Sequence, residues 1–213
     1  MKTTVRKPAA QRREEIANAV LRIIGERGLT SLTTATLAAE VGLTTGALFR
    51  HFPSLDEILI ATVRQGVDRI DDTFPDKALP AIDFILALAR NRVRILGADP
   101  GLAWLLRSDQ AELNLPDEAV QLLRSVIRRT RRCLLGALRE GVADGSIRGD
   151  VEPEILLVPI LGTIHAVIGM PGTRSRVARG SRSKPERVLS ALALLLAPPG
   201  GASRRIKRTN TAS

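Results

Sequence analysis

Length, composition and charge limit the classes of protein that this sequence can form. The chain has 213 residues, 44% of them hydrophobic, so it can bury a core without help from disulfides or a metal. A single cysteine leaves no internal disulfide and no Cys-x-x-Cys metal site, and no apolar run is long enough to predict a membrane span. The first residues also lack an apolar signal-peptide core, so we expect a soluble cytoplasmic protein. We expect no cofactor.

The net charge of +10 is concentrated at one end of the chain. Residues 172–213 carry 10 Lys/Arg against 1 Asp/Glu, whereas residues 1–60 carry 8 against 6. A basic segment rich in Gly, Pro and Ser attracts phosphate without selecting a sequence, so the overall charge does not locate a specific nucleic-acid site. Residues 198–213 are expected to form a disordered basic tail.

Helical periodicity dominates the sequence and predicts an all-α fold of about nine helices. Gly28 and Gly42 are stop signals, and Ser54 and Glu57 have capping-box spacing at the start of a further helix. Residues 171–185 are expected to form a loop. In chain order, the expected helices span residues 8–27, 33–41, 44–51, 54–73, 80–96, 100–108, 116–141, 151–169 and 186–197.

Residues 33–52, TTATLAAEVGLTTGALFRHF, have the spacing of a helix-turn-helix motif. Gly42 suits a turn position with positive φ, which a side chain would strain. A second helix that begins with small polar residues and carries no acid can lie in the major groove of DNA. Its first turn would be Thr44, Thr45, Gly46 and Ala47. The side chains expected to pack against the first helix are Leu37, Ala38, Val41, Leu43 and Leu48.

The stretch from Arg13 to about Ile58 resembles the N-terminal domain of TetR-family regulators. The family's recognition helix ends in an aromatic residue, a variable residue, His and an aromatic residue, and a Ser-capped helix follows. Here that run is LFRHFPS at residues 48–54, and LREGVADGSIR at 138–148 resembles the end of the family's long seventh helix and the turn after it. The resemblance implies a helix-turn-helix DNA-binding domain over residues 1–53 and a helical effector-binding and dimerisation domain over residues 54–197.

The resemblance also indicates which residues contact double-stranded DNA. Phe49 and Leu55 stand where the family often has Tyr and Lys, which usually serve as phosphate contacts. We therefore expect the basic N-terminal arm, Arg6, Lys7, Arg12 and Arg13, to share that role, since each phosphate-paired cation adds roughly one unit of salt dependence. The predicted DNA-binding residues are Arg6, Arg12, Thr33, Thr34, Thr44, Thr45, Gly46, Ala47, Phe49, Arg50 and His51.

The threonines in this set also have a structural explanation. Thr44 and Thr45 can cap the second short helix, in addition to or instead of contacting DNA, and Thr33 can cap the first. If Thr33 caps that helix, the resemblance implies that the amides of its first turn bind a phosphate.

The residues at the end of the motif allow similar alternatives. His51 either packs at the helix end or contacts a phosphate. Arg50 either reaches the DNA backbone or is merely solvated. Phe49 and Phe52 are expected to pack rather than to contact bases.

In the C-terminal part, the resemblance implies a small-molecule pocket between the fourth and eighth helices. Phe84, Trp104 and His165 are the unusual residues expected there, although an aromatic residue at helical spacing is commonly core and His165 can be a hydrogen-bonded core histidine. Cys133 follows two arginines, so a redox-sensing thiol is an alternative to an inert side chain. The arginine run at 128–132 is most simply a solvated face.

The apolar helix expected at 151–169 carries apolar residues on more than one face, which exceeds what packing on a single neighbour requires. The resemblance implies that the helices at about 152–170 and 186–197 join those of a second copy across a two-fold axis. We expect a homodimer that places two recognition helices on a pseudo-palindromic site.

Three functions remain in competition. The first is an operator-binding repressor that a small-molecule effector releases. The second is a TetR-type DNA-binding protein that acts through a protein partner, in a nucleoid or cell-division role, without an effector. The third, an enzyme, is disfavoured because the sequence has no nucleophile elbow, phosphate loop or His/carboxylate cluster. A helical adaptor that does not bind DNA is disfavoured by the motif itself.

Overall fold

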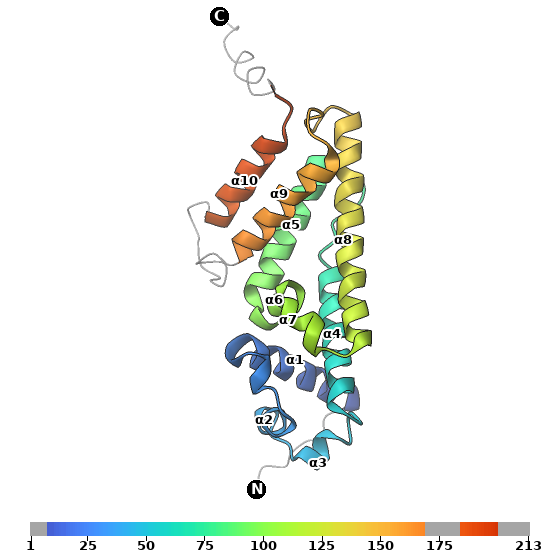
Figure 1. The fold of residues 1–213 in the computed structure, drawn as a ribbon, viewed down its shortest axis with the longest axis vertical. Helices are drawn as coiled ribbons and strands as arrows, with labels where there is room; N and C mark the ends of the chain where they lie inside the picture. Colours follow the sequence, from blue (N-terminus) through green and yellow to red (C-terminus); the bar gives the residue numbers. More distant parts are fainter. Residues whose placement is uncertain (1–7, 169–183, 200–213) are drawn as a thin grey trace, which may run out of the picture. The chain divides into compact units, whose positions relative to one another are not determined.

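The computed structural model describes residues 8–168 and 184–199, and within these ranges the chain is all-α, as predicted (Figure 1). No strand occurs among the described residues. The ten α-helices are α1 (Ala9–Arg27), α2 (Thr34–Glu40), α3 (Thr45–Leu48), α4 (Leu55–Asp71), α5 (Ala81–Ala98), α6 (Pro100–Arg107), α7 (Asp109–Asn114), α8 (Asp117–Ala143), α9 (Pro153–Ile168) and α10 (Lys184–Leu196).

Two short elements were not predicted. A 3₁₀ helix, η1 (Leu29–Ser31), links α1 to α2, and α7 lies between α6 and α8. Helix α7 has six residues, of which only Ala111 is buried. Such a segment has no helical periodicity of apolar residues, so the sequence does not predict it. The helix expected to end at residue 141 is slightly longer, because α8 continues to Ala143.

The chain forms two compact units. The first comprises the residues up to Asp72 together with Ile95–Ile127, and the second comprises Thr73–Arg94 and the residues from Arg128 onward. Helices α5 and α8 each contribute residues to both units. The functional division at residue 53, and the separate tail at 198–213, stay predictions.

In the first unit, α1 is the central helix. Its apolar side chains are almost completely buried, with Ile16, Val20 and Ile23 at 0% exposure, and α4 and α6 pack against it. The approach of α6 is close because glycine occupies both sides of the contact. A Cβ atom added to Gly101 would lie 2.0 Å from the carbonyl oxygen of Leu21, and one added to Gly25 would lie 2.7 Å from the Gly101 nitrogen.

The second unit contains the C-terminal part of α8 together with α9 and α10. Leu134 and Leu138 of α8 are fully buried, as is Ile160 of α9. After α8 the chain reverses through Gly145, whose φ is +76°. Ile147 then donates its N–H to the Gly141 carbonyl at 2.8 Å and buries its side chain to 1% exposure. The turn that the resemblance of residues 138–148 implies after the long helix is therefore present.

Candidate nucleic-acid interface

Helix α2 is fixed at its start by a reciprocal cap. The Thr36 N–H donates to Thr33 Oγ1 at 3.1 Å, and the Thr33 N–H donates to Thr36 Oγ1 at 2.9 Å. Thr33 is thus the N-cap, as expected, and the Thr36 half of the cap was not anticipated because a threonine replaces the usual Glu or Gln. Thr33 is exposed and Thr34 is half-buried at this end of the helix.

The turn between α2 and α3 has the geometry that the motif requires. Gly42 has φ +66°, in the region that side chains disfavour, and the Leu43 N–H donates to the Ala38 carbonyl at 2.8 Å. Leu37, Ala38 and Leu48 are buried, as predicted. Val41 and Leu43 are only half-buried, because they lie at the turn itself rather than on the inner faces of the two helices.

Helix α3 has four residues and is capped by Thr44. Thr44 Oγ1 accepts from the Ala47 N–H at 3.1 Å, and the Thr44 carbonyl accepts from the Leu48 N–H at 2.9 Å. The capping role proposed for Thr44 is therefore present. Thr45 and Gly46 are exposed and Ala47 is half-buried, so the first turn of α3 offers a small, uncharged surface.

The residues that follow α3 alternate between exposure and burial. Phe52 is 2% exposed and packs inside the first unit, as expected. Phe49 is 41% exposed, so the expectation that it packs away from solvent is only partly met. Arg50 is exposed and His51 is half-buried, which leaves both near the surface that α3 presents.

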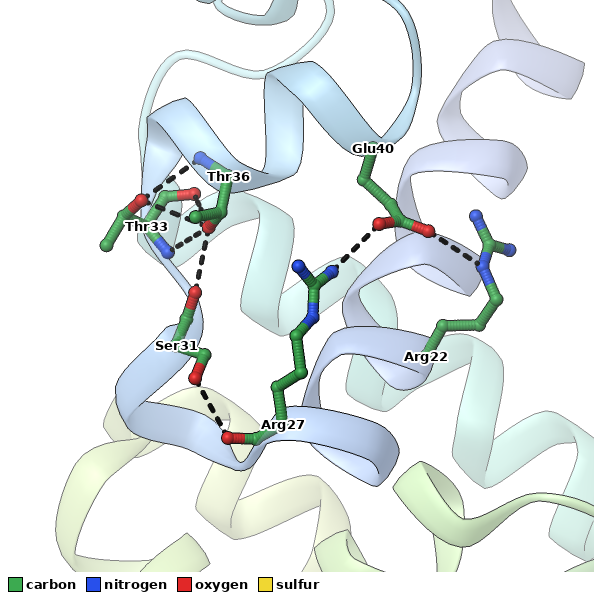
Figure 2. Close-up of polar contacts among 6 residues, drawn as sticks. All are labelled: Arg22, Arg27, Ser31, Thr33, Thr36 and Glu40. Carbon is green, nitrogen blue, oxygen red and sulfur yellow. Dashed lines mark hydrogen bonds and ion pairs between the residues drawn. The ribbon is translucent and has the colours of Figure 1, made fainter.

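A polar network holds α2 against α1 (Figure 2). Figure 2 shows Glu40, at the end of α2, between two arginines of α1: Arg27 Nη2 donates to Glu40 Oε2 at 2.8 Å, and Arg22 Nε donates to Glu40 Oε1 at 3.3 Å. In the same view Ser31 Oγ donates to the Arg27 carbonyl, and Thr36 Oγ1 donates to the Ser31 carbonyl, each at 2.8 Å. These contacts were not predicted, because their partners lie on different elements.

Helix α4 begins where predicted. Ser54 Oγ accepts from the Glu57 N–H at 3.1 Å and caps the helix, and Leu55 is its first residue. Farther along α4, Arg69 Nη1 donates to Asp99 Oδ2 at 2.7 Å, while Asp99 Oδ1 accepts from the Leu102 N–H and so caps α6. One carboxylate thus joins α4 to the start of α6.

Residues 16–62 match the family model described as "Bacterial regulatory proteins, tetR family". Over these residues the chain has the N-terminal domain of the TetR family of regulators. The matched residues run from the middle of α1, through the helix-turn-helix, into α4.

Relatives of known name agree with this assignment. The fatty acid metabolism regulator protein of Bacillus subtilis is 23% identical over 158 residues, which is 72% of this chain and 80% of that protein. The nucleoid occlusion factor SlmA of Vibrio vulnificus is 28% identical over 169 residues, 73% of this chain and 81% of that protein. The crystal structure of AibR in complex with isovaleryl coenzyme A and operator DNA has the same fold, with a TM-score of 0.71 and 18% identity over 88% of this chain and 99% of that one.

The basic arm of this TetR-family domain makes contacts within the chain. Arg12 Nη1 pairs with Glu15 Oε2 at 2.9 Å, one turn along α1. Arg13 Nε donates to the His51 carbonyl at 3.1 Å, and its guanidinium carbon lies 4.7 Å from the centre of the Phe52 ring. Arg6 and Lys7 lie outside the described residues.

The three residues expected to line an effector pocket lie in different environments. Phe84 on α5 is 7% exposed, and Trp104 on α6 is half-buried. His165 on α9 is exposed, so the alternative interpretation of His165 as a core histidine is wrong for the single chain. Phe84 and His165 belong to the second unit and Trp104 belongs to the first.

A cavity of about 530 Å³ lies in the first unit, bordered by α1, α4 and the junction of α5 and α6. Asn18, Gln65, Arg69 and Asp99 are among its lining residues, whereas Phe84, Trp104 and His165 are not. Its walls are polar, which differs from the mostly apolar lining that small-molecule sites usually have.

On α8, Arg128, Arg131 and Arg132 are exposed but Arg129 is half-buried, so the solvated face expected at 128–132 is present only in part. Cys133 is half-buried. Over residues 8–168 and 184–199, no group of three His, Cys, Asp or Glu side chains is arranged to hold a metal ion. None of the described helices combines the length and the apolar character that crossing a membrane requires.

Proposed function

We propose that the chain is a dimeric repressor that binds a pseudo-palindromic operator through α3 and is released by a small-molecule effector. The observation that carries this proposal is the surface of α3. The helix is capped by Thr44 and backed by the buried Leu48, and it exposes Thr45, Gly46 and Arg50 with no acidic residue between Val41 and Pro53. Such a surface can approach base edges and phosphates without electrostatic repulsion.

The proposed DNA contacts fall into two groups. In the first group, Thr45, Gly46 and Ala47 would contact base edges. In the second, Arg50 and His51, together with Arg6 and Lys7 of the N-terminal arm, would contact phosphates. Arg12 can join them only by exchanging its pairing with Glu15 for a phosphate. Thr33, Thr34, Thr44 and Phe49 complete the proposed footprint.

The proposed dimer rests on apolar side chains that the single chain leaves exposed. On α9, Ile155 is 58% and Val158 67% exposed, and on α10, Leu194 is 75% and Leu195 63% exposed. Gly162 shares the exposed side of α9, and a Cβ atom added there would meet nothing within 4 Å, which leaves room for another helix to approach. A second copy of α9 and α10 would cover this surface and form a four-helix bundle.

For the effector we propose an acyl-coenzyme A thioester as the first class to test. One solved relative is described in complex with isovaleryl coenzyme A and operator DNA, and one sequence relative is named a fatty acid metabolism regulator. An effector lowers operator occupancy only through a difference in affinity between the two states of the protein, and a tenfold effect requires about 1.4 kcal/mol. Helix α4 would transmit the change, since Ser54 begins it directly after the DNA-binding segment.

Selection of bound fragments from a random DNA pool, at near-physiological salt, tests the proposal. We expect the purified protein to enrich a pseudo-palindromic consensus, and we expect the Thr45→Ala variant to lose it. Thr30→Ala is the matched control, because Thr30 is an exposed threonine of η1 outside the motif. Fragments without a consensus, enriched equally by the Thr45→Ala variant but not after deletion of residues 198–213, would contradict the proposal and assign DNA binding to the tail.

A second candidate is a DNA-binding protein that acts through a protein partner without an effector. The relationship to the nucleoid occlusion factor SlmA supports it. Many closely clustered genomic sites, together with no release of DNA by any acyl-coenzyme A, would favour this candidate over the repressor.

A further inference from the structure

We propose that Arg13 is a positioning residue for the recognition helix α3, and not a contact to DNA phosphate. The inference rests on the proposed function, since it presumes that α3 contacts the operator. It differs from the expectation for the basic arm, in which Arg13 would share phosphate binding with Arg6, Lys7 and Arg12.

Two contacts connect Arg13 to the end of the motif. Arg13 belongs to α1, yet its Nε donates to the carbonyl of His51, 38 residues later, at 3.1 Å. The Cζ atom of the same guanidinium lies over the ring of Phe52, 4.7 Å from the ring centre. Because Phe52 is 2% exposed, the ring is a fixed support for the guanidinium.

The two contacts of Arg13 lie at the end of the short helix α3, where they can stabilise it. A four-residue helix has too few internal hydrogen bonds to persist alone, so α3 depends on what holds its two ends. Thr44 holds the first end through the Ala47 N–H. At the other end, the His51 and Phe52 N–H groups both donate to the Leu48 carbonyl, at 3.0 and 3.2 Å, and Arg13 holds the His51 carbonyl.

The surroundings of Arg13 also disfavour a phosphate. A cavity of about 260 Å³ beside Arg13 and Phe52 is lined by Glu14, Glu57 and Glu118, while Arg64 is the other basic residue that borders it. Three carboxylates against two guanidinium groups repel an anion that approaches from this side. The cation is therefore best placed to serve the carbonyl end of the α3 turn, where a positive charge is also favoured by the peptide dipoles.

Amide hydrogen exchange of the protein without DNA gives the first test. In the Arg13→Met variant we expect exchange at residues 49–52 to accelerate about tenfold or more, with the amides at the centre of α1 unchanged. Arg12→Met is the matched control. Arg12 is the neighbouring arginine on α1, and its ion pair with Glu15 lies within the same helix. Unchanged exchange at 49–52 in Arg13→Met would overturn the proposal, whatever the outcome of operator selection.

DNA binding gives the second test, using the operator that the selection identifies. We expect Arg13→Met to weaken operator binding roughly tenfold, to change binding to unrelated DNA by less than about twofold, and to leave the salt dependence of binding unchanged. A phosphate contact would instead lower both affinities together and reduce the salt slope by about one unit.

The charge-conserving variant Arg13→Lys also distinguishes a positioning role from a phosphate contact. Lys keeps the positive charge but lacks the planar guanidinium that can stack on Phe52 while donating to a carbonyl. We expect Arg13→Lys to bind operator as weakly as Arg13→Met, and recovery of wild-type affinity by Arg13→Lys would overturn the proposal. The lysine variant also gives both measurements if Arg13→Met fails to fold.

Discussion

Helices α1 and α9 are both rich in apolar residues, but their environments differ. All the large apolar side chains of α1, from Ile16 to Ile24, are buried within the chain. On α9, Leu157 and Ile160 are buried, whereas Ile155 and Val158 are 58% and 67% exposed. The apolar side chains of α1 are covered by other residues of the same chain, whereas α9 has an apolar surface that the described residues do not cover. Apolar content alone therefore does not distinguish a core helix from an interface helix.

The largest effect is expected on the α1 side of this comparison, from Gly101→Ala. The new Cβ atom would lie 2.0 Å from the Leu21 carbonyl oxygen, which is backbone and cannot rotate away, so α6 must move off α1. We expect a loss of about 3 kcal/mol in the free energy of unfolding, measured by urea denaturation.

Gly136→Ala provides the control for that substitution. Gly136 lies inside α8, and a Cβ atom added to it would meet nothing within 4 Å. Alanine there should increase stability by about 0.5–1 kcal/mol, through helix propensity alone. Equal effects at the two glycines would show that close packing on α1 is not what Gly101 provides.

On the α9 side, Val158→Asp should leave the fold of the single chain intact and break the proposed dimer. An aspartate at this exposed position costs little in the monomer but places a charge in an apolar interface. We expect a monomer in sedimentation velocity, and operator binding weaker by on the order of 100-fold because the two recognition helices are no longer linked.

Leu113→Asp is the matched control for the dimer variant. Leu113 is 76% exposed but belongs to α7, outside the proposed dimer surface. It should change neither the sedimentation coefficient nor operator affinity. Dissociation by Leu113→Asp, with Val158→Asp still dimeric, would place the interface elsewhere.

The smallest effect concerns the ion pair between α8 and α9. Arg139 donates a hydrogen bond to Glu154 and thereby lowers the pKa of that carboxyl below its usual 4.5. The stabilisation is present above pH 4.5, where the unfolded chain is also ionised, and is lost as the pH falls through the lowered pKa of the folded state. Glu154→Gln should therefore reduce the loss of stability between about pH 6 and about pH 3.

The change will be slight, because both side chains are exposed. Thermal unfolding at a series of pH values measures it. Glu140→Gln is the control for the loss of one negative charge, because it removes an exposed carboxylate of α8 and leaves the Arg139–Glu154 pair in place.

The parts of the fold that the sequence predicted depend on local signals. Gly28 and Gly42 adopt the positive φ expected at helix ends and turns, and Thr33, Thr44 and Ser54 cap the helices that follow them. Each of these signals acts within about four residues, so a periodic pattern and its boundaries suffice to find it.

The parts that were missed depend on contacts between distant residues. Arg13 meets His51, and Arg69 meets Asp99 across 30 positions, and neither pairing leaves a pattern in the sequence. For His165 the sequence left two alternatives, a pocket residue and a core histidine, but the side chain is exposed, because the face of α9 that turns inward is decided by the helices that pack against it. Sequence therefore located the candidate DNA-binding surface, whereas the contacts that hold it required the structure.

The four-residue length of α3 bears on how a protein of this kind could acquire a new operator. Its support lies in Thr44, Leu48 and the elements around them, while Gly46 has ordinary backbone geometry and open space around it. Substitutions at Thr45 and Gly46 should thus alter the bases that are preferred with little change in folding stability. A lineage could explore new regulatory targets through these few positions while the scaffold stays constant.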